Sequence, residues 1–343
     1  MNFDIPVLVS EAVKNQVTAR WDSLTKPRGS LGRLEELVVQ LALIADDPMP
    51  SVERKGLYVF CADHGVAAEG VSPYPSSVTA QMVKNFLRGG AAINVLCRQA
   101  AITHMIVDAG VDAPVEAGVV DRKIARGTGN FAWEPAMRCD QAEEAIERGA
   151  ALAKDAKARF DICGVGEMGI GNTTSAAALL SVFGGLTPDL SVGRGAGLDD
   201  SGLRRKADVI SRALDLHRPN PADPVGVLQA VGGFEIAMIA GFLLGAAESR
   251  LPVVVDGFIA SSAALVAHGL SANVIDYVLF SHRSAEQAHS RMLSFLKARP
   301  ILDLDLRLGE GTGAALALQI LDSAVRLYRE MSTFAEAGVS DKG

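Results

Sequence analysis

Residues 164–180, GVGEMGIGNTTSAAALL, carry the glycine spacing of two kinds of phosphate-binding loop. Gly164, Gly166 and Gly169 match the dinucleotide pattern G-x-G-x-x-G, and the run from Gly166 onward matches a Walker A loop with Asn172 in place of lysine. Such glycines lie between a strand and a helix, where backbone N–H groups and the helix dipole bind anions. We therefore predict an anion site with a helix beginning near Asn172 or Thr173; a tight turn without a ligand is the alternative.

Two absences narrow the kind of phosphate. The lysine of a Walker A loop contacts the outer phosphates of a triphosphate, and Asn172 offers only an amide in its place. A dinucleotide site needs an acid at the end of the next strand, but that region reads LTPDLSVGRGAG and Asp189 follows no strand. The prediction is the monophosphate of a single sugar.

A second glycine-rich segment, VGRGAGLDDSGLRRKADVI at residues 192–210, places Arg194 among glycines ahead of a helix that starts near Asp200 or Ser201. Arg194 or Lys206 could supply the positive charge that the first loop lacks. The alternative is a surface loop followed by a solvated helix face.

Glu310 lies between two glycines in LDLDLRLGEGTGAALAL, after a segment whose alternating leucines predict an extended backbone and just before a predicted helix. Small neighbours let a carboxylate approach a ligand, and partial burial raises its pKa into the range of a general base. The alternative is an acid that stabilises the N-terminus of the helix.

The sequence gives weaker support for a metal site, a catalytic histidine or a serine nucleophile. His282, Glu286 and His289 would share one face of a helix, but no zinc-protease motif is present and we predict no metal site. His64 follows Asp63 and is interpreted as a hydrogen-bonding loop residue. The sequence lacks the G-x-S-x-G motif of many serine hydrolases.

Apolar runs that end in small or acidic residues predict strands within 56–65, 102–112, 160–169, 251–258 and 275–284. Stretches of helical length lie between them, at 78–98, 141–159, 173–183, 202–214, 227–247 and 259–270. This alternation predicts an α/β fold with a doubly wound, Rossmann-like and mostly parallel sheet. The polar residues after each strand then gather at one rim, where ligands bind.

The two ends of the chain predict a separate helical unit. Residues 10–24, 31–45 and 311–338 have helical patterns. We expect residues 1–50 and 311–343 to form a small helical subdomain and residues 51–310 to form the large α/β domain that contains the anion site.

Composition excludes several classes of partner. A net charge of -7 disfavours binding to nucleic acid or anionic membranes. Without a signal sequence or a long apolar stretch, the protein is expected in the cytoplasm. The four scattered cysteines are expected to be buried and reduced.

Together these segments resemble the nicotinate-nucleotide–dimethylbenzimidazole phosphoribosyltransferase family over nearly the whole chain. The resemblance rests on several long strings of unusual composition. They are KPRGSLGRLE, ADHGV, VTAQMVKNFLRGGAAINVL, GEMGIGNTTSAAAL, VGRGAG, VVDGFIASSAAL, SHRSAEQAH and LGEGTGAALA.

The resemblance implies a reaction in the synthesis of the lower ligand of cobalamin. Nicotinate mononucleotide would lose nicotinate, and a ring nitrogen of 5,6-dimethylbenzimidazole would take its place at C1′ in a single displacement, giving α-ribazole 5′-phosphate. The glutamate of the LGEGTG motif, Glu310 here, would be the general base. The resemblance also implies a homodimer, no required cofactor or metal, and tolerance of more than one aromatic base.

The same resemblance assigns binding residues. The ribose and phosphate of the nucleotide would be bound by Glu167, Gly169, Gly171, Asn172, Thr173, Arg194, Gly257 and Lys206. The aromatic base would be bound by Gln81 and Leu308, with Pro73 and Ser284 nearby.

Three alternatives remain on the sequence. An NAD-dependent oxidoreductase would use the first glycine loop but lacks the ribose-binding acid. A non-catalytic nucleotide-binding protein would use the same loop as a sensor. Transfer from phosphoribosyl pyrophosphate usually requires magnesium and adjacent acids after a strand, where the sequence VVVDGF offers only Asp256.

Overall fold

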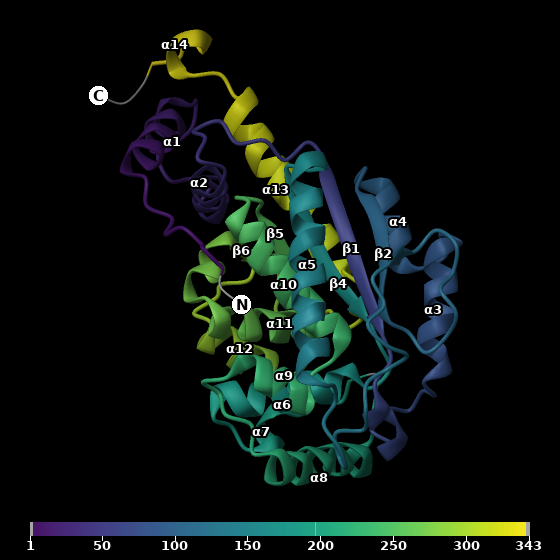
Figure 1. The fold of residues 1–343 in the computed structure, drawn as a ribbon. Helices are drawn as coiled ribbons and strands as arrows, with labels where there is room; N and C mark the ends of the chain where they lie inside the picture. The colour runs from purple at the N-terminus through teal and green to yellow at the C-terminus, as the bar shows by residue number, and fades with distance from the viewer. Residues whose placement is uncertain (1–2, 196, 341–343) are drawn as a thin grey trace.

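The computed structural model describes residues 3–195 and 197–340. Its centre is a parallel sheet of six strands in the order β3-β2-β1-β4-β5-β6 (Figure 1). The strands are β1 (Lys55–Ala62), β2 (Thr103–Gly110), β3 (Val120–Asp121), β4 (Ile162–Met168), β5 (Val253–Val255) and β6 (Val278–Phe280). This is the order of a doubly wound sheet, so the predicted fold class is confirmed.

Helices cover the two faces of the sheet because its central strands are apolar on both sides; β1, for example, is buried at every position. On one face, α10 (Phe234–Glu248) packs against β1, β2 and β4, with α5 (Cys139–Arg159) outside it and α11 (Phe258–Leu270) beside it. On the other face lie α3 (Ser77–Leu87), α4 (Ala92–Gln99) and α13 (Thr312–Glu330).

The remaining helices connect these layers or lie at the ends of the chain. They are α1 (Glu11–Ser23), α2 (Arg33–Ala45), η1 (Gly65–Glu69), α6 (Asn172–Gly184), α7 (Pro188–Ser191), α8 (Asp200–His217), α9 (Pro224–Val231), η2 (Ala272–Tyr277), α12 (His289–Phe295) and α14 (Phe334–Ala337). Within the described ranges, no helix has both the length and the apolar stretch needed to cross a bilayer.

The helices of the two chain ends lie together, as Figure 1 shows for α1, α2 and α13. The rings of Trp21 and Tyr328 are 4.9 Å apart, and Nε of Arg20 donates to the carbonyl of Tyr328 at 2.9 Å. The same α13 also packs against β1, β4 and β5. One helix therefore connects the terminal helices to the central sheet.

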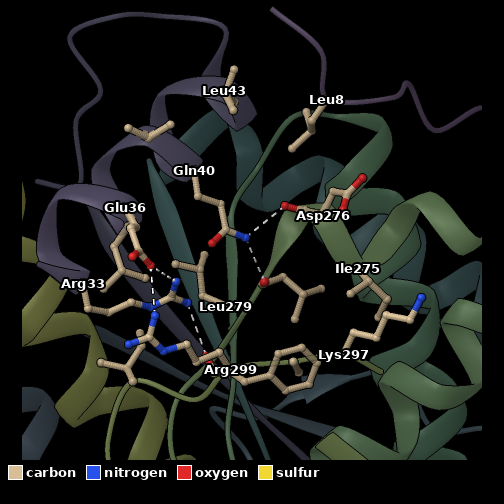
Figure 2. A pocket seen from close by; sticks show the side chains of 16 residues that line it. Leu8, Arg33, Glu36, Gln40, Leu43, Ile275, Asp276, Leu279, Lys297 and Arg299 are labelled. Carbon is tan, nitrogen blue, oxygen red and sulfur yellow. Dashed lines mark hydrogen bonds and ion pairs between the residues drawn. The ribbon is translucent and has the colours of Figure 1, made fainter. Parts of the chain in front are cut away.

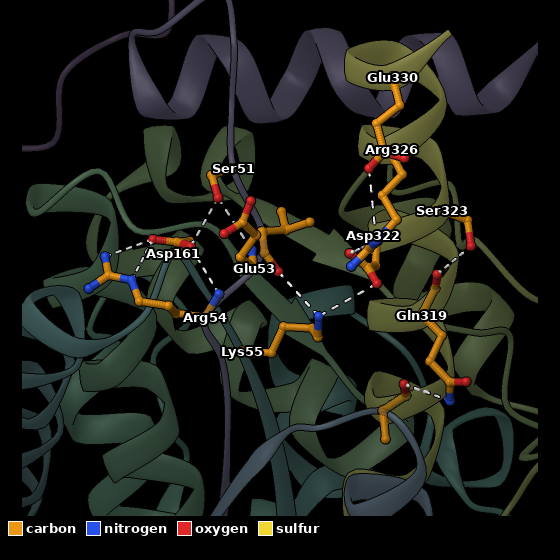
Figure 3. Close-up of polar contacts among 12 residues, drawn as sticks. Ser51, Glu53, Arg54, Lys55, Asp161, Gln319, Asp322, Ser323, Arg326 and Glu330 are labelled. Atoms are coloured by element: carbon orange, nitrogen blue, oxygen red, sulfur yellow. Dashed lines mark hydrogen bonds and ion pairs between the residues drawn. The ribbon is translucent and has the colours of Figure 1, made fainter.

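Polar contacts fix α13 at the amino ends of the strands, opposite the predicted site (Figure 3). Lys55, at the start of β1, is buried and lies 3.6 Å from the carboxylate of Asp322 on α13. Its neighbour Arg54 forms an ion pair of 2.7 Å with Asp161, just before β4. These contacts align the two central strands with the helix that follows Glu310.

Three of the expected helices are divided in the structure, two of them at glycines, so those predictions were too long. The expected helix 78–98 is α3 and α4, separated at Gly89, whose φ of 76° ends α3. The expected helix 227–247 breaks at Gly232 and Gly233 into α9 and α10. The expected helix 311–338 ends at Glu330, and α14 is separate.

Two further expectations need correction. Residues 282–289 do not form one helix, since His282 bridges to Leu302 beside β6 and only His289 begins α12. The three side chains therefore do not share one helix face, and among residues 3–195 and 197–340 no group of His, Cys, Asp or Glu is arranged to bind a metal ion. The second correction concerns Cys139, which is exposed at the start of α5, whereas the other three free cysteines are buried as expected.

Candidate active site

The predicted anion loop after β4 and the Glu310 loop lie together at the carboxyl end of the sheet, beside the junction of β1 and β4, where the chain order of the sheet changes direction. In sheets of this kind, ligands bind at that point. β4 ends at Met168, and α6 begins at Asn172 as the sequence predicted. The backbone N–H of Glu310 donates to the carbonyl of Glu167 on β4 at 3.3 Å. A segment far along the chain thus brings its acid to the end of the central strands.

The backbone at Glu310 is unusual. Gly309, Glu310 and Gly311 all have positive φ, at 81°, 62° and 82°. A non-glycine residue in this conformation is disfavoured and is held by its surroundings. Gly166 in β4 allows the approach, because a Cβ there would collide with the backbone of Gly311.

Asp256 holds this loop from the end of β5. Its two carboxylate oxygens accept the N–H groups of Gly311 at 3.0 Å and Ala314 at 3.1 Å. Burial raises the pKa of Asp256, although His282 at 3.8 Å and these N–H groups act in the opposite direction. Asp256 therefore positions Glu310 and adds negative charge beside it.

Glu310 has the electrostatic properties of a general base. Its side chain is 7% exposed, and no hydrogen-bond donor in the described part of the chain reaches its Oε2. Burial, with a smaller contribution from Asp256, raises the pKa of Glu310 to about 7. A carboxylate with this pKa and a free oxygen can accept a proton near neutral pH.

Glu167 is the second buried acid of the site. Its Oε2 accepts a hydrogen bond from Nδ2 of Asn172, and its Oε1 lies so close to Gly309 that any side chain there would crowd it. Burial raises the pKa of Glu167 to about 8, with further contributions from Asp256 and Glu235. Two neighbouring acids therefore hold protons more tightly than exposed carboxyl groups do.

The predicted anion loop is completed by a lysine from another helix. Gly171, with a φ of 98°, precedes the first residue of α6. Lys206 of α8 is 1% exposed, and its Nζ donates to Oγ1 of Thr173 at 2.9 Å and to the carbonyl of Gly193 at 3.3 Å. Burial lowers the pKa of Lys206 to about 8. The structure thus places a positive charge at the N-terminus of α6, where the Walker-type pattern lacks its own lysine.

Arg194 and Gly257, which were also expected to bind the nucleotide, lie apart from the contact between Lys206 and Thr173. The guanidinium of Arg194 forms an ion pair of 2.5 Å with Asp200 in an exposed setting, so the structure does not bring it to Thr173 and Lys206. Gly257 precedes α11, and a Cβ there would lie 3.2 Å from the His282 ring and 3.8 Å from Ser284.

The residues expected to bind an aromatic base are mostly exposed. Leu308, two residues before Glu310, is 56% exposed, and Gln81 and Pro73 are also at the surface. Thr79, two residues before Gln81, accepts the N–H of Ile170 at 3.1 Å and so ties α3 to the anion loop. Ser284 is buried beside Gly257.

Sequence reasoning missed a buried pair beneath the anion loop. Nε2 of His64 and Oε1 of Glu235, on α10, are 2.6 Å apart with both side chains fully buried. The His64 ring packs close to Gly169 and Gly233, and the His64 Cβ lies close to Gly171, so added Cβ atoms at these glycines would meet the histidine. The hydrogen-bonding interpretation of His64 agrees with this contact, but its partner lies 171 residues away and leaves no local pattern.

A cavity of about 450 Å³ lies elsewhere, between α2 and the edge strand β6 (Figure 2). Nε2 of Gln40 donates there to the carbonyls of Asp276 and Val278. Arg33 and Arg299 both contact one oxygen of Glu36. None of the predicted site residues lines this cavity.

The fold and the site define an α/β enzyme with an anion loop and a buried carboxylate at the switch point of its sheet. A family model described as "Phosphoribosyltransferase" matches residues 7–339. The nicotinate-nucleotide–dimethylbenzimidazole phosphoribosyltransferase of Geobacter sp. strain M21 is 51% identical over 97% of this chain and 96% of its own. The protein of the same name from Cupriavidus necator is 52% identical over 99% of both chains.

A solved structure agrees with these relatives. The crystal structure of CobT from Thermus thermophilus is 45% identical, with a TM-score of 0.91 over 96% of this chain and 99% of that one. The chain therefore belongs to the nicotinate-nucleotide–dimethylbenzimidazole phosphoribosyltransferase family and is a transferase that acts on small molecules. Membership decides against an NAD-dependent oxidoreductase and against a non-catalytic nucleotide-binding protein.

Proposed function

We propose that the enzyme transfers the phosphoribosyl group of nicotinate mononucleotide to 5,6-dimethylbenzimidazole, giving α-ribazole 5′-phosphate and nicotinate for cobalamin synthesis. The relatives named for this donor and acceptor are 50–52% identical over nearly the whole chain, which supports the proposal. Single in-line displacement accounts for the change from a β-configured donor to an α-configured product.

One observation carries the mechanism, namely the buried Glu310 carboxyl with a free oxygen and a pKa of about 7. One ring nitrogen of dimethylbenzimidazole would attack C1′ while Glu310 takes the proton from the other. The C1′–N bond to nicotinate breaks, and the pyridine nitrogen keeps the electron pair. Since that nitrogen is positively charged in the donor, its departure needs no acid. Holding the two rings in line supplies much of the remaining rate.

The nucleotide would lie between β4 and the start of α6. Lys206 and Thr173 are in hydrogen-bonding contact there, which suits a phosphate group together with Gly169, Gly171 and Asn172. Glu167 suits the hydroxyl groups of the ribose because it lies beside both Asn172 and the Glu310 loop. Gly257 would allow the ligand close to the backbone, and Arg194 would have to leave Asp200 to take part.

The aromatic base would lie against Leu308 and Gln81, with Pro73 and Ser284 at the edges. The large exposed fraction of Leu308 supports this placement, because an apolar side chain at the surface next to Glu310 can be covered by a flat apolar ligand. A contact of this kind is tolerant of ring substituents, which fits a family that accepts several bases.

The direct test is a product assay. The enzyme is mixed with nicotinate mononucleotide and dimethylbenzimidazole in the presence of EDTA, and the products are separated and identified by mass and by NMR of the anomeric proton. The proposal expects nicotinate and α-ribazole 5′-phosphate in equal amounts. No product at saturating substrates, or product only with phosphoribosyl pyrophosphate and magnesium, would contradict it.

We further propose, from the family resemblance, that the enzyme is a cytoplasmic homodimer. Light scattering on the purified protein measures the mass in solution; a monomer at micromolar concentration would contradict the dimer.

We also propose that the chain is divided into a terminal helical subdomain and a large domain, with α13 running through both.

A further inference from the structure

Glu286 lies in the segment between β6 and α12, and its carboxyl reaches the glycine loop around Lys206. A Cβ added to Gly193 would collide with Oε2 of Glu286, so the acid lies directly on the Gly193 backbone. No hydrogen-bond donor among the described residues reaches that oxygen, although it is shielded from water.

The groups that face Glu286 are cationic or are donors. Burial raises the pKa of the Glu286 carboxyl, while Lys206, the backbone N–H of Gly195 and Arg307 act in the opposite direction. Lys206 makes no ion pair within 4.0 Å in the described part of the chain, so Glu286 stands near this lysine without contacting it. A buried ammonium group at the positive end of α6 is stabilised by a nearby anion, and Glu286 is the acid that faces it.

The same donors suit a phosphate group. Nζ of Lys206 is hydrogen-bonded to Oγ1 of Thr173 in the first turn of α6, and a Cβ on Gly195 would lie only 3.3 Å from that Nζ and 3.2 Å from that Oγ1. Lys206, Thr173 and the Gly195 N–H therefore form one compact group around a small volume. A phosphate bound there would lie beside the Glu286 carboxylate, and the two anions would repel each other.

We propose that Glu286 determines anion specificity in this enzyme by serving as the counter-ion of Lys206 in the free protein, from which the 5′-phosphate of the donor nucleotide displaces it. This inference rests on the proposed function, because it takes the donor to carry a 5′-monophosphate. A doubly charged phosphate with several acceptor oxygens gains enough from Lys206, Thr173 and the Gly195 N–H to displace a carboxylate. A singly charged anion does not, so the resident acid excludes it.

The test uses inorganic phosphate as the probe, with the full-length enzyme, titrated by calorimetry at constant ionic strength and at pH 7, below the pKa of Lys206. Glu286→Gln keeps the shape of the side chain and removes its charge. Phosphate is expected to bind this variant about fivefold more tightly than it binds the wild type, because the repulsion is gone. Glu143→Gln, at an exposed position on α5, is the matched control and leaves the dissociation constant unchanged.

Weaker or unchanged phosphate binding in Glu286→Gln would overturn the inference, since it would mean that the acid supports the site or does not face it. Glu286→Ala serves as a second variant if the glutamine form fails to fold, with the same expectation. Lys206→Met should lose phosphate binding, and unchanged binding there would place the ion elsewhere and overturn the inference as well. Turnover of nicotinate mononucleotide by the wild type is measured separately, so failure of the proposed function shows as absent product whatever the phosphate titration gives.

Discussion

At the scale of single residues, Glu310 is held in a state that suits catalysis and costs stability. Its carboxyl is buried next to Asp256, and Glu167 with its own raised pKa lies beside the same loop. A carboxyl group whose pKa is higher in the folded than in the unfolded protein favours folding while it is protonated. That contribution is lost as the pH rises through the folded pKa, here between the ordinary value of 4.5 and about 7.

A stability measurement follows from this sign. Glu310→Gln should melt higher than the wild type at pH 8, by about 2 °C, since glutamine has no charge to bury. At pH 5 the wild-type carboxyl is protonated in the fold, and the difference should shrink. Scanning calorimetry at both pH values checks this. A wild type that is more stable than the variant at pH 8 would contradict the burial argument.

At the scale of elements, the site is formed by the Glu310 loop and the N-terminus of α6, which both lie at the end of β4. Gly166 permits the Glu310 loop to lie against the strand, and α8 brings Lys206 to the start of α6. Both contacts join segments distant in sequence. The first positions the Glu310 loop and the second completes the anion loop, so a substitution at each contact tests a different half of the site.

The glycine contact is tested by stability. Gly166→Ala adds a methyl group against the backbone of Gly311, which cannot move as a flexible side chain would. We expect a loss of more than about 2 kcal/mol in the free energy of unfolding, measured by urea titration. Gly184→Ala in α6 is the control, because its Cβ would make only ordinary contacts of 3.4–3.5 Å. Equal stability of both variants would mean that the loop does not pack as described.

The lysine contact is tested by kinetics. Lys206→Met keeps the length of the side chain but removes the charge, and it should raise the KM for nicotinate mononucleotide at least about tenfold. The KM for dimethylbenzimidazole should change little, since the base would lie on the other side of the ribose. Arg204→Met, exposed on the same helix, is the control. An equal rise in both KM values would indicate a general disturbance instead of a lost phosphate contact.

The sequence predicted which helices and strands form better than it predicted where they end. It also predicted the anion loop better than the distant residues that pack against that loop. Buried apolar runs separated by helical stretches are enough to indicate a parallel sheet, and the start of α6 followed from its glycines. The breaks at Gly89 and at Gly232 were missed although each falls at a pair of adjacent glycines, because the apolar helical stretches on both sides were interpreted as continuous. The pair of His64 and Glu235 depends on tertiary packing across 171 positions and has no sequence signature.

At the scale of the whole molecule, α13 runs from the site to the helices at the N-terminus. Its first residue follows the Glu310 loop by one position, and Tyr328 near its end contacts Trp21 of α1. The stability of the terminal helices is therefore expected to affect the entire fold.

The two tryptophans of the chain offer a matched pair. Trp21 is 2% exposed, and Trp21→Ala should cost about 3–5 kcal/mol in a single unfolding transition. Trp133 is 67% exposed, and Trp133→Ala should cost less than about 1 kcal/mol. Urea unfolding followed by circular dichroism compares them. A separate early transition in Trp21→Ala would show that the terminal helices unfold independently of the sheet.

The most direct test of the central claim is the single-turnover rate of Glu310→Gln with saturating nicotinate mononucleotide and dimethylbenzimidazole. If Glu310 takes the proton from the attacking base, the rate should fall by about 10²–10⁴, while the donor still binds within about fivefold of the wild-type affinity. The wild-type rate should rise with pH through about 7. A variant that turns over at the wild-type rate with the same pH dependence would show that another group accepts the proton.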